Sequence, residues 1–252
     1  MILKFEMYVP QLDKNRRIHI YVPDEYEKSG KKYPVLYMFD GHNLFEDSEA
    51  TYGKSWNLAN KIKETGKDLI VVGIECSHEG NQRLAEYTPF PYADSDFALL
   101  VDALGKETMD FIVDTLKPYI DKRFPTKPER EFTWIGGSSC GGSMALFAIQ
   151  DYNKYFAKAI CLSPFIRPYY DYMLINAWHT QIEEPTSLYI SWGALEGPGK
   201  HAFIQETVMI TEIANGLMEH GVNVRFHVKE EGMHCEADWE QEAPVYLKFL
   251  VN

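Results

Sequence analysis

The stretch Gly137-Ser138-Ser139-Cys140-Gly141 constrains this chain more than any other. It has the pattern G-x-S-x-G and lies between an apolar run at 132–135 and a helical pattern at 143–150. A serine between a strand and a helix must turn sharply, which lifts its hydroxyl above the sheet and strains its backbone. Glycines on either side leave room for this turn, because a Cβ there would strike a neighbouring strand or helix. The context therefore predicts Ser139 as a nucleophile, whereas the five letters alone fit a simple small-residue turn equally well.

Short apolar blocks recur along the chain, separated by segments with helical periodicity. Blocks of this kind are typical of central strands that are covered on both faces. The predicted strands are 35–39, 69–74, 132–135, 159–162, 188–192 and 222–226, and the predicted helices are 55–65, 96–120, 140–151, 201–220 and 236–250. Alternating polarity in 2–9 and 16–22 predicts an antiparallel opening pair joined through 11–15. Strands that alternate with helices imply an α/β fold with a mostly parallel central sheet and helices on both faces.

Length and composition narrow the class of protein. The 252 residues fit one α/β domain, residues 1–252, without linkers, repeats or low-complexity tracts. A formal charge of −12 argues against nucleic-acid binding, which needs clustered lysine and arginine. The start of the chain lacks the features of a signal peptide, and no apolar run approaches the ~18 residues of a membrane span. We therefore expect a cytoplasmic protein without a membrane partner, although a chain trimmed of its leader would have the same sequence.

The cysteines give no sign of a metal or disulfide framework. Cys76, Cys140, Cys161 and Cys235 are widely spaced and contain no C-x-x-C pair. Neither a zinc site nor a set of disulfides is predicted from this spacing. No metal and no cofactor are expected.

A serine nucleophile needs an adjacent base, and that base needs an orienting group. In this architecture functional groups gather at the carboxyl ends of strands, and the expected chain order is serine, acid, histidine. His234 lies in a loop between the last predicted strand and the last predicted helix, and Glu196 is the first carboxylate after the strand 188–192. We therefore predict His234 as the base and Glu196 as the acid. The alternative for each is an exposed residue in a surface loop.

Acyl transfer also requires N–H donors aimed at the developing oxyanion. The elbow supplies one donor, the backbone N–H of Cys140. The strand 35–39 is followed by Asp40-Gly41-His42-Asn43, where Gly41 permits a tight reversal. We expect the backbone N–H of His42 to be the second donor. Its imidazole is a weaker alternative as base, since it precedes Ser139 in the chain.

With these residues in view, the sequence resembles the α/β-hydrolase branch that includes esterase D, feruloyl and acetyl-xylan esterases, enterochelin-type esterases and mycolyl transferases. The matching segments occur in the family's order over nearly the whole chain, at 33–41, 137–142, 193–197 and 232–239. The resemblance implies an α/β-hydrolase fold in which Ser139 is the nucleophile, Glu196 the acid and His234 the base. It also implies that the amides of His42 and Cys140 form the oxyanion hole. Cys140 itself departs from the family, where methionine or glutamine is more frequent.

Several residues are candidates for a substrate pocket, because their segments follow predicted strands or are rich in aromatic groups. They are Asn43, Arg83, Tyr87, Phe165, Trp178 and Trp192. The alternative for Arg83 is a pair with Glu86 that braces its loop, and the alternative for the aromatic residues is plain packing. Because no long insertion suggests a large lid, we expect a fairly open site.

The expected function is hydrolysis of a carboxylic ester through a Ser-His-Glu triad and an acyl-enzyme. The expected substrate is a small or polymer-borne acyl ester, including carbohydrate-linked esters. The alternatives are an acyltransferase on the same triad, a siderophore-lactone esterase and a non-catalytic binding protein on a hydrolase scaffold. The sequence leaves the oligomeric state open.

Overall fold

A computed structural model describes residues 1–94, 99–183 and 185–251, and a central sheet of eight strands organises them. The strand order is β1-β2-β4-β3-β7-β8-β9-β10, and the short strands β5 and β6 form a separate hairpin. The strands are β1 Ile2–Val9, β2 Lys14–Tyr21, β3 Val35–Phe39, β4 Ile70–Ile74, β5 Tyr92–Asp94, β6 Leu99–Val101, β7 Thr133–Ser138, β8 Lys158–Leu162, β9 Ser187–Gly193 and β10 Asn223–Lys229. β2 runs antiparallel to both β1 and β4, whereas the strands from β4 to β10 in the sheet are parallel. The predicted mostly parallel sheet with an antiparallel N-terminal pair is confirmed.

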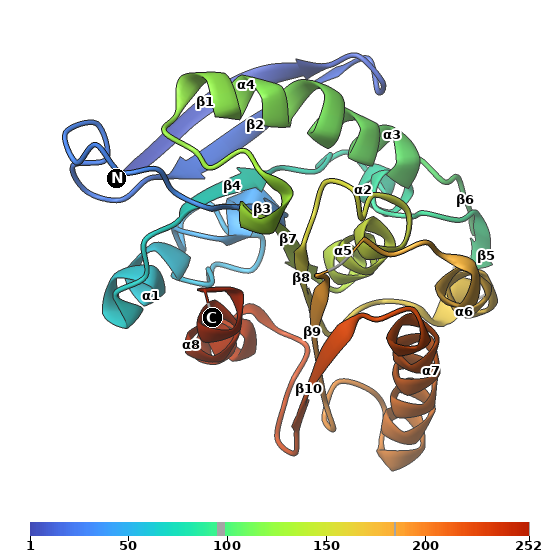
Figure 1. Cartoon of the computed structure of the whole chain (residues 1–252). Helices are drawn as coiled ribbons and strands as arrows, with labels where there is room; N and C mark the ends of the chain where they lie inside the picture. The colour runs from blue at the N-terminus through green and yellow to red at the C-terminus, as the bar shows by residue number, and fades with distance from the viewer. Residues whose placement is uncertain (95–98, 184, 252) are drawn as a thin grey trace.

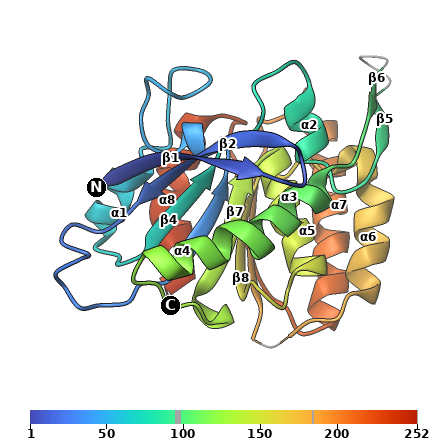
Figure 2. The same ribbon diagram turned by 90° about the horizontal axis from the view of Figure 1, so that it is seen from above.

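Helices cover both faces of this sheet (Figure 1). They are α1 Leu58–Thr65, α2 Gln82–Glu86, α3 Gly105–Phe111, α4 Lys117–Arg123, α5 Cys140–Asp151, α6 Tyr170–His179, α7 Lys200–Glu219 and α8 Glu236–Val251, with 3-10 turns at Gly41–Asn43, Arg130–Phe132 and Arg167–Tyr169. Successive residues of a strand point to opposite faces, so each strand contributes to two apolar layers. Leu36 and Met38 of β3 pack in the layer that α1 and α8 cover, while Tyr37 and Phe39 pack in the layer under α3 to α7. Figure 2 shows the same division, with α8 behind the sheet and α3, α4 and α5 in front.

The predicted helix 96–120 is only partly correct, and its first residues, 96–98, lie outside the described part of the chain. Leu99–Val101 forms strand β6, which pairs antiparallel with β5. Helix begins at Gly105 and continues through a π-helical turn, Ile112–Leu116, into α4. Pairing of the two short strands satisfies their backbone groups and buries Val101, which outweighs the helical pattern of this segment. The hairpin lies at the periphery of the molecule beside α6 (Figure 2).

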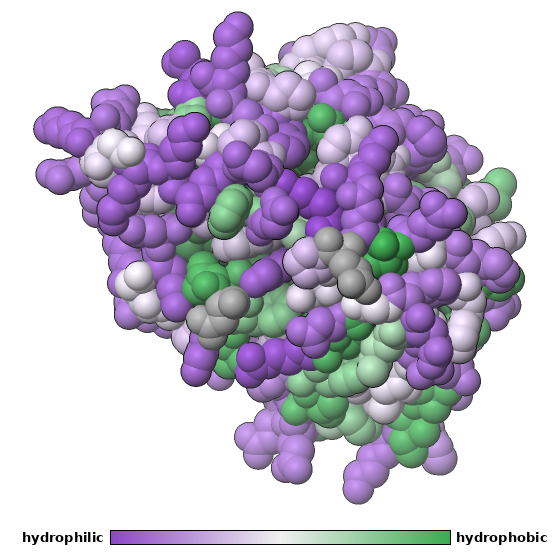
Figure 3. Space-filling view, in the orientation of Figure 1, coloured by the Kyte–Doolittle hydropathy of each residue, from purple (hydrophilic) through white to green (hydrophobic). Residues whose placement is uncertain are grey.

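The surface in Figure 3 is mostly hydrophilic, with hydrophobic residues gathered over α7 and the edge strand β10. Exposed residues of these elements include Ile204, Val208, Phe226 and Val228. Within the described residues, no helix has both the length and the apolar character needed to cross a bilayer.

The topology creates a switch point between two central strands. From β3 the chain moves to β4 on one side, and later returns to place β7 on the other side of β3. The connections that leave the carboxyl ends of β3 and β7 therefore diverge, which opens a crevice where ligands bind in sheets of this type. The loop after β3 carries Asp40 and His42, and the turn after β7 carries Ser139.

Candidate active site

Ser139 occupies the predicted elbow between β7 and α5, with φ 54° and ψ −124°. Such a conformation is strained for a residue with a side chain, and the flanking glycines explain how the fold holds it. A Cβ at Gly137 would lie 2.7 Å from the carbonyl carbon of Gly141, and a Cβ at Gly141 would lie 2.8 Å from the Cβ of Phe39. Helix α5 therefore packs so closely on β3 and β7 that the chain must turn within one residue.

Strain recurs at the same edge of the sheet. Asp40, Ser139 and Ser163 directly follow the neighbouring strands β3, β7 and β8, and all three have positive φ. Their φ values are 56°, 54° and 46°. Left-handed backbone costs a non-glycine residue about 1–2 kcal/mol, so its repetition at three adjacent strand ends marks this edge as a candidate functional site.

Glu196 and His234 form a direct pair at this edge. His234 Nδ1 lies 3.1 Å from Glu196 Oε2, although 38 residues separate the two in the chain. Glu196 is largely buried, with 14% of its side chain exposed, whereas 38% of the His234 side chain is exposed. A buried carboxylate on Nδ1 leaves Nε2 of the imidazole free to act on a neighbouring hydroxyl. The structure thus brings together the two residues that the sequence assigns as acid and base.

The other oxygen of Glu196 is held by two donors. Ser163 Oγ donates to Glu196 Oε1 over 2.8 Å, and the Gly193 backbone N–H donates to the same oxygen over 2.5 Å. Ser163 in turn accepts a 3.1 Å hydrogen bond from Trp239 Nε1, and the Trp239 ring packs edge-on against His234. Ser163 and Trp239 therefore hold the side chains of Glu196 and His234, the predicted acid and base, in place. Sequence reasoning missed both, and the one available signal was a serine directly after the strand 159–162.

The loops that carry Glu196 and His234 are joined backbone to backbone. Leu195 N–H donates to the Gly232 carbonyl over 3.0 Å, and Ala194 N–H donates to the Lys229 carbonyl over 2.9 Å. A Cβ at Gly232 would lie 2.8 Å from the Cα of Gly193, so neither loop has space for a side chain at this contact.

Asp238 fixes the far side of the histidine loop, accepting hydrogen bonds from Lys229 Nζ over 2.6 Å and the Met233 N–H over 3.0 Å. Asp238 therefore ties the first turn of α8 to the loop that carries His234.

Backbone hydrogen bonds connect Ser139 to the segment that holds Glu196. Ser139 N–H donates to the Leu162 carbonyl, and Phe165 N–H donates to the Ser139 carbonyl, both over 3.0 Å. Leu162 and Phe165 flank Ser163, whose hydroxyl binds the acid. The turn at Ser139 and the side chain of Glu196 are thus both hydrogen-bonded to the short segment 162–165.

The loop after β3, which carries the predicted oxyanion donor His42, reverses at a different residue from the one predicted. Asp40, not Gly41, has the left-handed conformation that reverses the chain. Gly41 is required instead by close packing, because a Cβ there would lie 2.6 Å from the carbonyl carbon of Gly73 in β4. Backbone hydrogen bonds found among the described residues do not use the N–H groups of His42 and Cys140, which leaves both available.

Arg83 clamps this loop from the side. Its Nε and one terminal nitrogen donate to the two oxygens of Asp40 over 2.8 and 2.7 Å. Burial alone would raise the pKa of Asp40, but the charge and hydrogen bonds of Arg83 bring it below its ordinary value. The alternative pairing of Arg83 with Glu86 is wrong, because Glu86 binds Arg16 of β2 instead.

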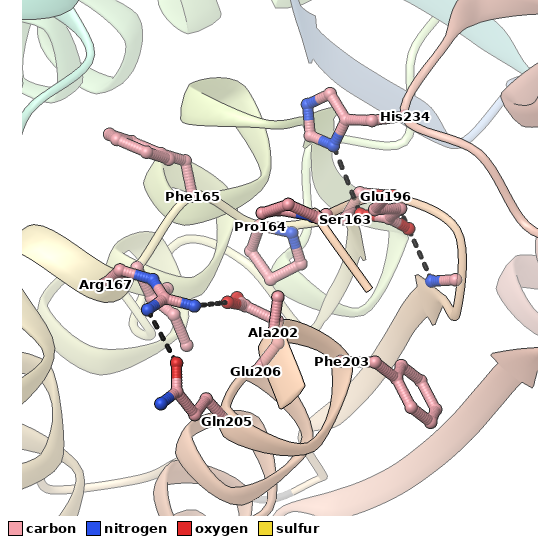
Figure 4. Close-up of a pocket in the computed structure, with 14 residues that line it drawn as sticks. Ser163, Pro164, Phe165, Arg167, Glu196, Ala202, Phe203, Gln205, Glu206 and His234 are labelled. Carbon is pink, nitrogen blue, oxygen red and sulfur yellow. Dashed lines mark hydrogen bonds and ion pairs between the residues drawn. The ribbon is translucent and has the colours of Figure 1, made fainter. Parts of the chain in front are cut away.

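A cavity of about 550 Å³ adjoins the acid–base pair. It is lined by Ser163, Pro164, Phe165, Ile166, Arg167, Gly193, Glu196, Gly197, Pro198, Ala202, Phe203, Gln205, Glu206 and His234. Figure 4 shows His234 at one end of this cavity and Arg167 with its partners Gln205 and Glu206 at the other. Burial raises the pKa of Glu206 to about 7, against the opposing charge of Arg167. The cavity therefore combines apolar walls with a polar end remote from the histidine.

A model of the family described as "Putative esterase" matches residues 10–250. The chain belongs to this esterase family. It is 28% identical to the uncharacterized protein YbbA of Bacillus subtilis over 145 residues, which are 57% of this chain and 54% of that protein. It is 29% identical to the esterase Rv1288 of Mycobacterium tuberculosis over 145 residues, which are 58% of this chain and 28% of that protein. The matched part thus spans about half or less of each relative's own length.

The fold of this esterase-family chain is similar to that of an IroE-like serine hydrolase from Shewanella oneidensis. The TM-score is 0.77 at 18% identity, over 98% of this chain and 80% of the other. At such identity the likeness is one of fold.

In this esterase-family chain, the predicted pocket residues divide into three groups. Phe165 lines the cavity beside His234. Asn43, Arg83 and Tyr87 lie instead around the loop after β3, where the Tyr87 hydroxyl accepts a hydrogen bond from the Asp40 N–H and Asn43 Oδ1 accepts one from the Thr51 N–H.

The two tryptophans do not line the cavity, which corrects their pocket assignment. Trp192 is buried on β9, and its Nε1 donates to Thr207 Oγ1 of α7 over 2.8 Å. Trp178 lies on α6, partly exposed, beside a separate hollow that it shares with Thr211. Aromatic content alone could not separate these packing roles from a pocket role.

Proposed function

We propose that this chain is a serine esterase that hydrolyses carboxylic esters through Ser139, His234 and Glu196. The observation that carries the proposal is the 3.1 Å contact between His234 Nδ1 and Glu196 Oε2, at the sheet edge where the strained Ser139 leaves β7. Family membership supports ester hydrolysis as the reaction. Each group has the role that its surroundings favour: a half-buried serine in a strained turn, a histidine with one nitrogen free and a largely buried carboxylate.

Hydrolysis proceeds through two acyl-transfer steps. His234 Nε2 takes the proton of Ser139 Oγ as that oxygen attacks the ester carbonyl, and the backbone N–H groups of His42 and Cys140 stabilise the oxyanion. Collapse of the tetrahedral intermediate expels the alcohol, which receives the proton from His234 and leaves an acyl-enzyme on Ser139. Water then attacks the acyl carbon, with His234 again as base, and releases the carboxylic acid. Glu196 holds the imidazole in the required tautomer and stabilises its cation throughout.

The cavity favours a short or polar group over a long alkyl chain. Phe165, Pro164 and Phe203 offer apolar contact near the catalytic pair, but Arg167 and Glu206 line the far end. A long acyl chain would have to desolvate these polar groups without replacing their hydrogen bonds, which is costly. We therefore propose a small or polymer-borne acyl ester as the substrate class.

Turnover of a p-nitrophenyl ester series, from acetate to decanoate together with ferulate, tests this function. The wild type and Ser139→Ala are compared, and a serine-directed phosphonate probe reports labelling of Ser139. We expect turnover that is greatest for a short or aromatic acyl group, falls towards decanoate, and disappears in Ser139→Ala. A folded wild type that neither turns over any ester nor reacts with the phosphonate would contradict the proposal and favour a scaffold that only binds.

Acyl transfer on the same triad is distinguished by its products. Added alcohols or sugars compete with water for the acyl-enzyme, so transfer would appear as a new ester at the expense of free acid. A siderophore lactone would be recognised by turnover that exceeds that of every simple ester in the series.

A further inference from the structure

Three side chains with metal-ligating atoms converge beside the loop after β3. His42 lies in that loop, and Cys76 and His78 follow β4, the neighbouring strand. One potential ligand atom from each of the three lies within 4.8 Å of the other two. The rings of His42 and His78 meet edge to face, with their centroids 4.6 Å apart. Two histidines and a cysteine form a donor set typical of zinc sites.

The burial and hydrogen bonding of His42 suit its ring as a metal ligand. Its side chain is 5% exposed, and Nε2 lies 3.0 Å from Thr51 Oγ1. Nδ1 is buried and has no hydrogen-bond partner among the described residues, although buried polar atoms are normally paired. Burial lowers the pKa of His42, which favours the neutral ring that a metal ligand must be.

Two further features describe the surroundings of the cluster. Glu75 Oε2 lies 3.4 Å from His78 Nε2, so a carboxylate borders the cluster without belonging to it. Cys76 is buried at 2% exposure, whereas 58% of the His78 side chain is exposed, so the cluster opens to solvent on the His78 side. A thiol buried in this way binds metal only as thiolate, and its proton leaves to solvent on binding.

The spacing of the three residues requires only a modest rearrangement. At metal–nitrogen and metal–sulfur distances of about 2.1 and 2.3 Å, ligand atoms of a tetrahedral site lie roughly 3.6 Å apart. The donors, at most 4.8 Å apart, would have to close by about 1 Å, which rotation of the exposed His78 and adjustment of Thr51 allow. Cysteine spacing alone could not reveal this set, because β3 and β4 bring His42 to the Cys76-Ser77-His78 segment.

We propose that His42, Cys76 and His78 bind a zinc-like divalent ion, and that this ion inhibits the active site. The inhibitory part rests on the proposed function, because the backbone N–H of His42 is the donor assigned to the oxyanion. An ion that draws the His42 ring towards Cys76 would turn this peptide group away from the substrate carbonyl. Binding is thus a property of the cluster itself, and inhibition is its consequence for catalysis.

Direct binding is measured first, without reference to activity. Metal-stripped protein is titrated with Zn²⁺ in competition with a chromogenic chelator, and with Co²⁺ to detect a thiolate-to-cobalt charge-transfer band. We expect one ion per chain and a cobalt band in the wild type. Cys76→Ser should lose the cobalt band, and both Cys76→Ser and His78→Ala should weaken zinc binding by about 10- to 100-fold or more. Cys235→Ser and His201→Ala are the matched controls and should bind as the wild type does.

Ester turnover in the presence of Zn²⁺ is the second measurement. We expect Zn²⁺ to lower the kcat of the wild type, but not that of Cys76→Ser or His78→Ala, both of which remain active without metal. If no ester is turned over, the binding measurements still decide the site independently of the proposed function. Equal zinc affinity in the wild type and in His78→Ala, an exposed change that leaves the core intact, would overturn the proposal. Wild-type binding without any loss of kcat would overturn its inhibitory part.

Discussion

At the carboxyl ends of the parallel strands, titratable side chains pair with one another, whereas at the amino ends Arg130 and Lys158 donate hydrogen bonds to backbone carbonyls. Arg83 binds Asp40 at the first edge, and Glu196 lies against His234. At the second edge Arg130 donates to the carbonyls of Asn153, Glu183 and Pro185, and Lys158 donates to the carbonyl of Leu250.

Strain separates the two edges as well. Positive φ occurs directly after β3, β7 and β8, but not at the described residues that directly precede these strands. At the amino edge, the side chains of Arg130 and Lys158 donate hydrogen bonds to backbone carbonyls, and the residues directly before the strands have unstrained backbone. These contacts stabilise the fold and bring no nucleophile or base together. The carboxyl edge has residues with strained backbone and titratable side chains that each need the partner beside them. This combination is typical of sites where stability is sacrificed for function. Paired substitutions at the two edges can test this difference.

The largest expected contrast lies between Ser139→Ala and Ser187→Ala. Removing the Ser139 hydroxyl eliminates the nucleophile, so kcat should fall by about 10⁴- to 10⁶-fold. Ser187 lies at the amino end of β9, and its alanine variant should retain wild-type kcat. Steady-state kinetics with the best p-nitrophenyl ester measures both, and circular dichroism verifies that each variant is folded. A Ser139→Ala protein with more than a few per cent of wild-type activity would show that the nucleophile lies elsewhere.

A smaller contrast is expected between Glu196→Gln and Glu183→Gln. In the first variant the new side-chain amide can donate to His234 Nδ1 and thereby stabilise the wrong tautomer, so kcat should fall by about 10²- to 10⁴-fold. Glu183 is exposed at the amino edge, where its backbone carbonyl rather than its carboxylate binds Arg130. Its variant should match the wild type in the same kinetic assay. A Glu196→Gln variant with the kcat of the wild type would show that another residue acts as the acid.

Arg83→Gln and Arg130→Gln should differ in how their stability loss depends on pH. Loss of Arg83 leaves the Asp40 carboxylate buried and unpaired, which should cost about 2–4 kcal/mol at pH 7. The pKa of Asp40 is lowered in the folded wild type, so the stability this pair contributes is present above the unfolded pKa and is lost as pH falls through the folded pKa. In Arg83→Gln, burial without the arginine raises the pKa of Asp40, so protonation removes the buried charge as pH falls and the deficit of this variant should shrink between pH 7 and pH 4.

Arg130 binds neutral carbonyls, so the deficit of Arg130→Gln should change less over the same range. Urea unfolding at several pH values measures both variants. Parallel pH profiles for the two would show that the Arg83–Asp40 pair does not act as described.

The smallest effect is expected from Ser163→Gly compared with Glu25→Gly. Glycine relieves the positive φ at both positions, 46° and 62°. At residue 163 it also removes the hydroxyl that binds Glu196, so kcat should fall about tenfold while the free energy of unfolding changes by less than about 1 kcal/mol. Glu25→Gly should leave kcat unchanged. If Ser163 acts on catalysis by holding Glu196, Ser163→Gly should not lower kcat further when Glu196 is already replaced by glutamine. Losses of kcat that add up in the double variant would contradict this positioning role.

The sequence predicted the parts of the site that are fixed by strand order. Ser139, Glu196 and His234 each follow a strand in a mostly parallel sheet, and the carboxyl ends of such strands meet at one edge. Ser163 also follows a strand, but a serine after a strand has many roles. Its contact with Glu196 depends on how β8 and β9 sit side by side, which no local pattern reports.

Pairing partners that the local pattern does not report explain the other differences. The spacing of Arg83 and Glu86 suggested a local pair, yet Arg16 of β2, distant in the chain, reaches Glu86 and leaves Arg83 for Asp40. The segment 96–120 has a helical pattern, but the nearby strand β5 pairs with Leu99–Val101 in a hairpin. In each case the partner supplied an interaction that outweighed the local preference.

In the proposed mechanism, the contact between Gly193 and Gly232 separates the proton-transfer groups from the cavity wall proposed to recognise the substrate. Main chain sets the spacing between the acid and base loops, so no side-chain substitution elsewhere needs to preserve it. The wall of the cavity formed by α7 begins after this contact and carries Gln205 and Glu206. Under the proposed function, substitutions along α7 would therefore change which ester is accepted while keeping the backbone contact that spaces Glu196 and His234. Exchange of α7 between relatives is accordingly a more promising route to new selectivity than redesign of the histidine loop.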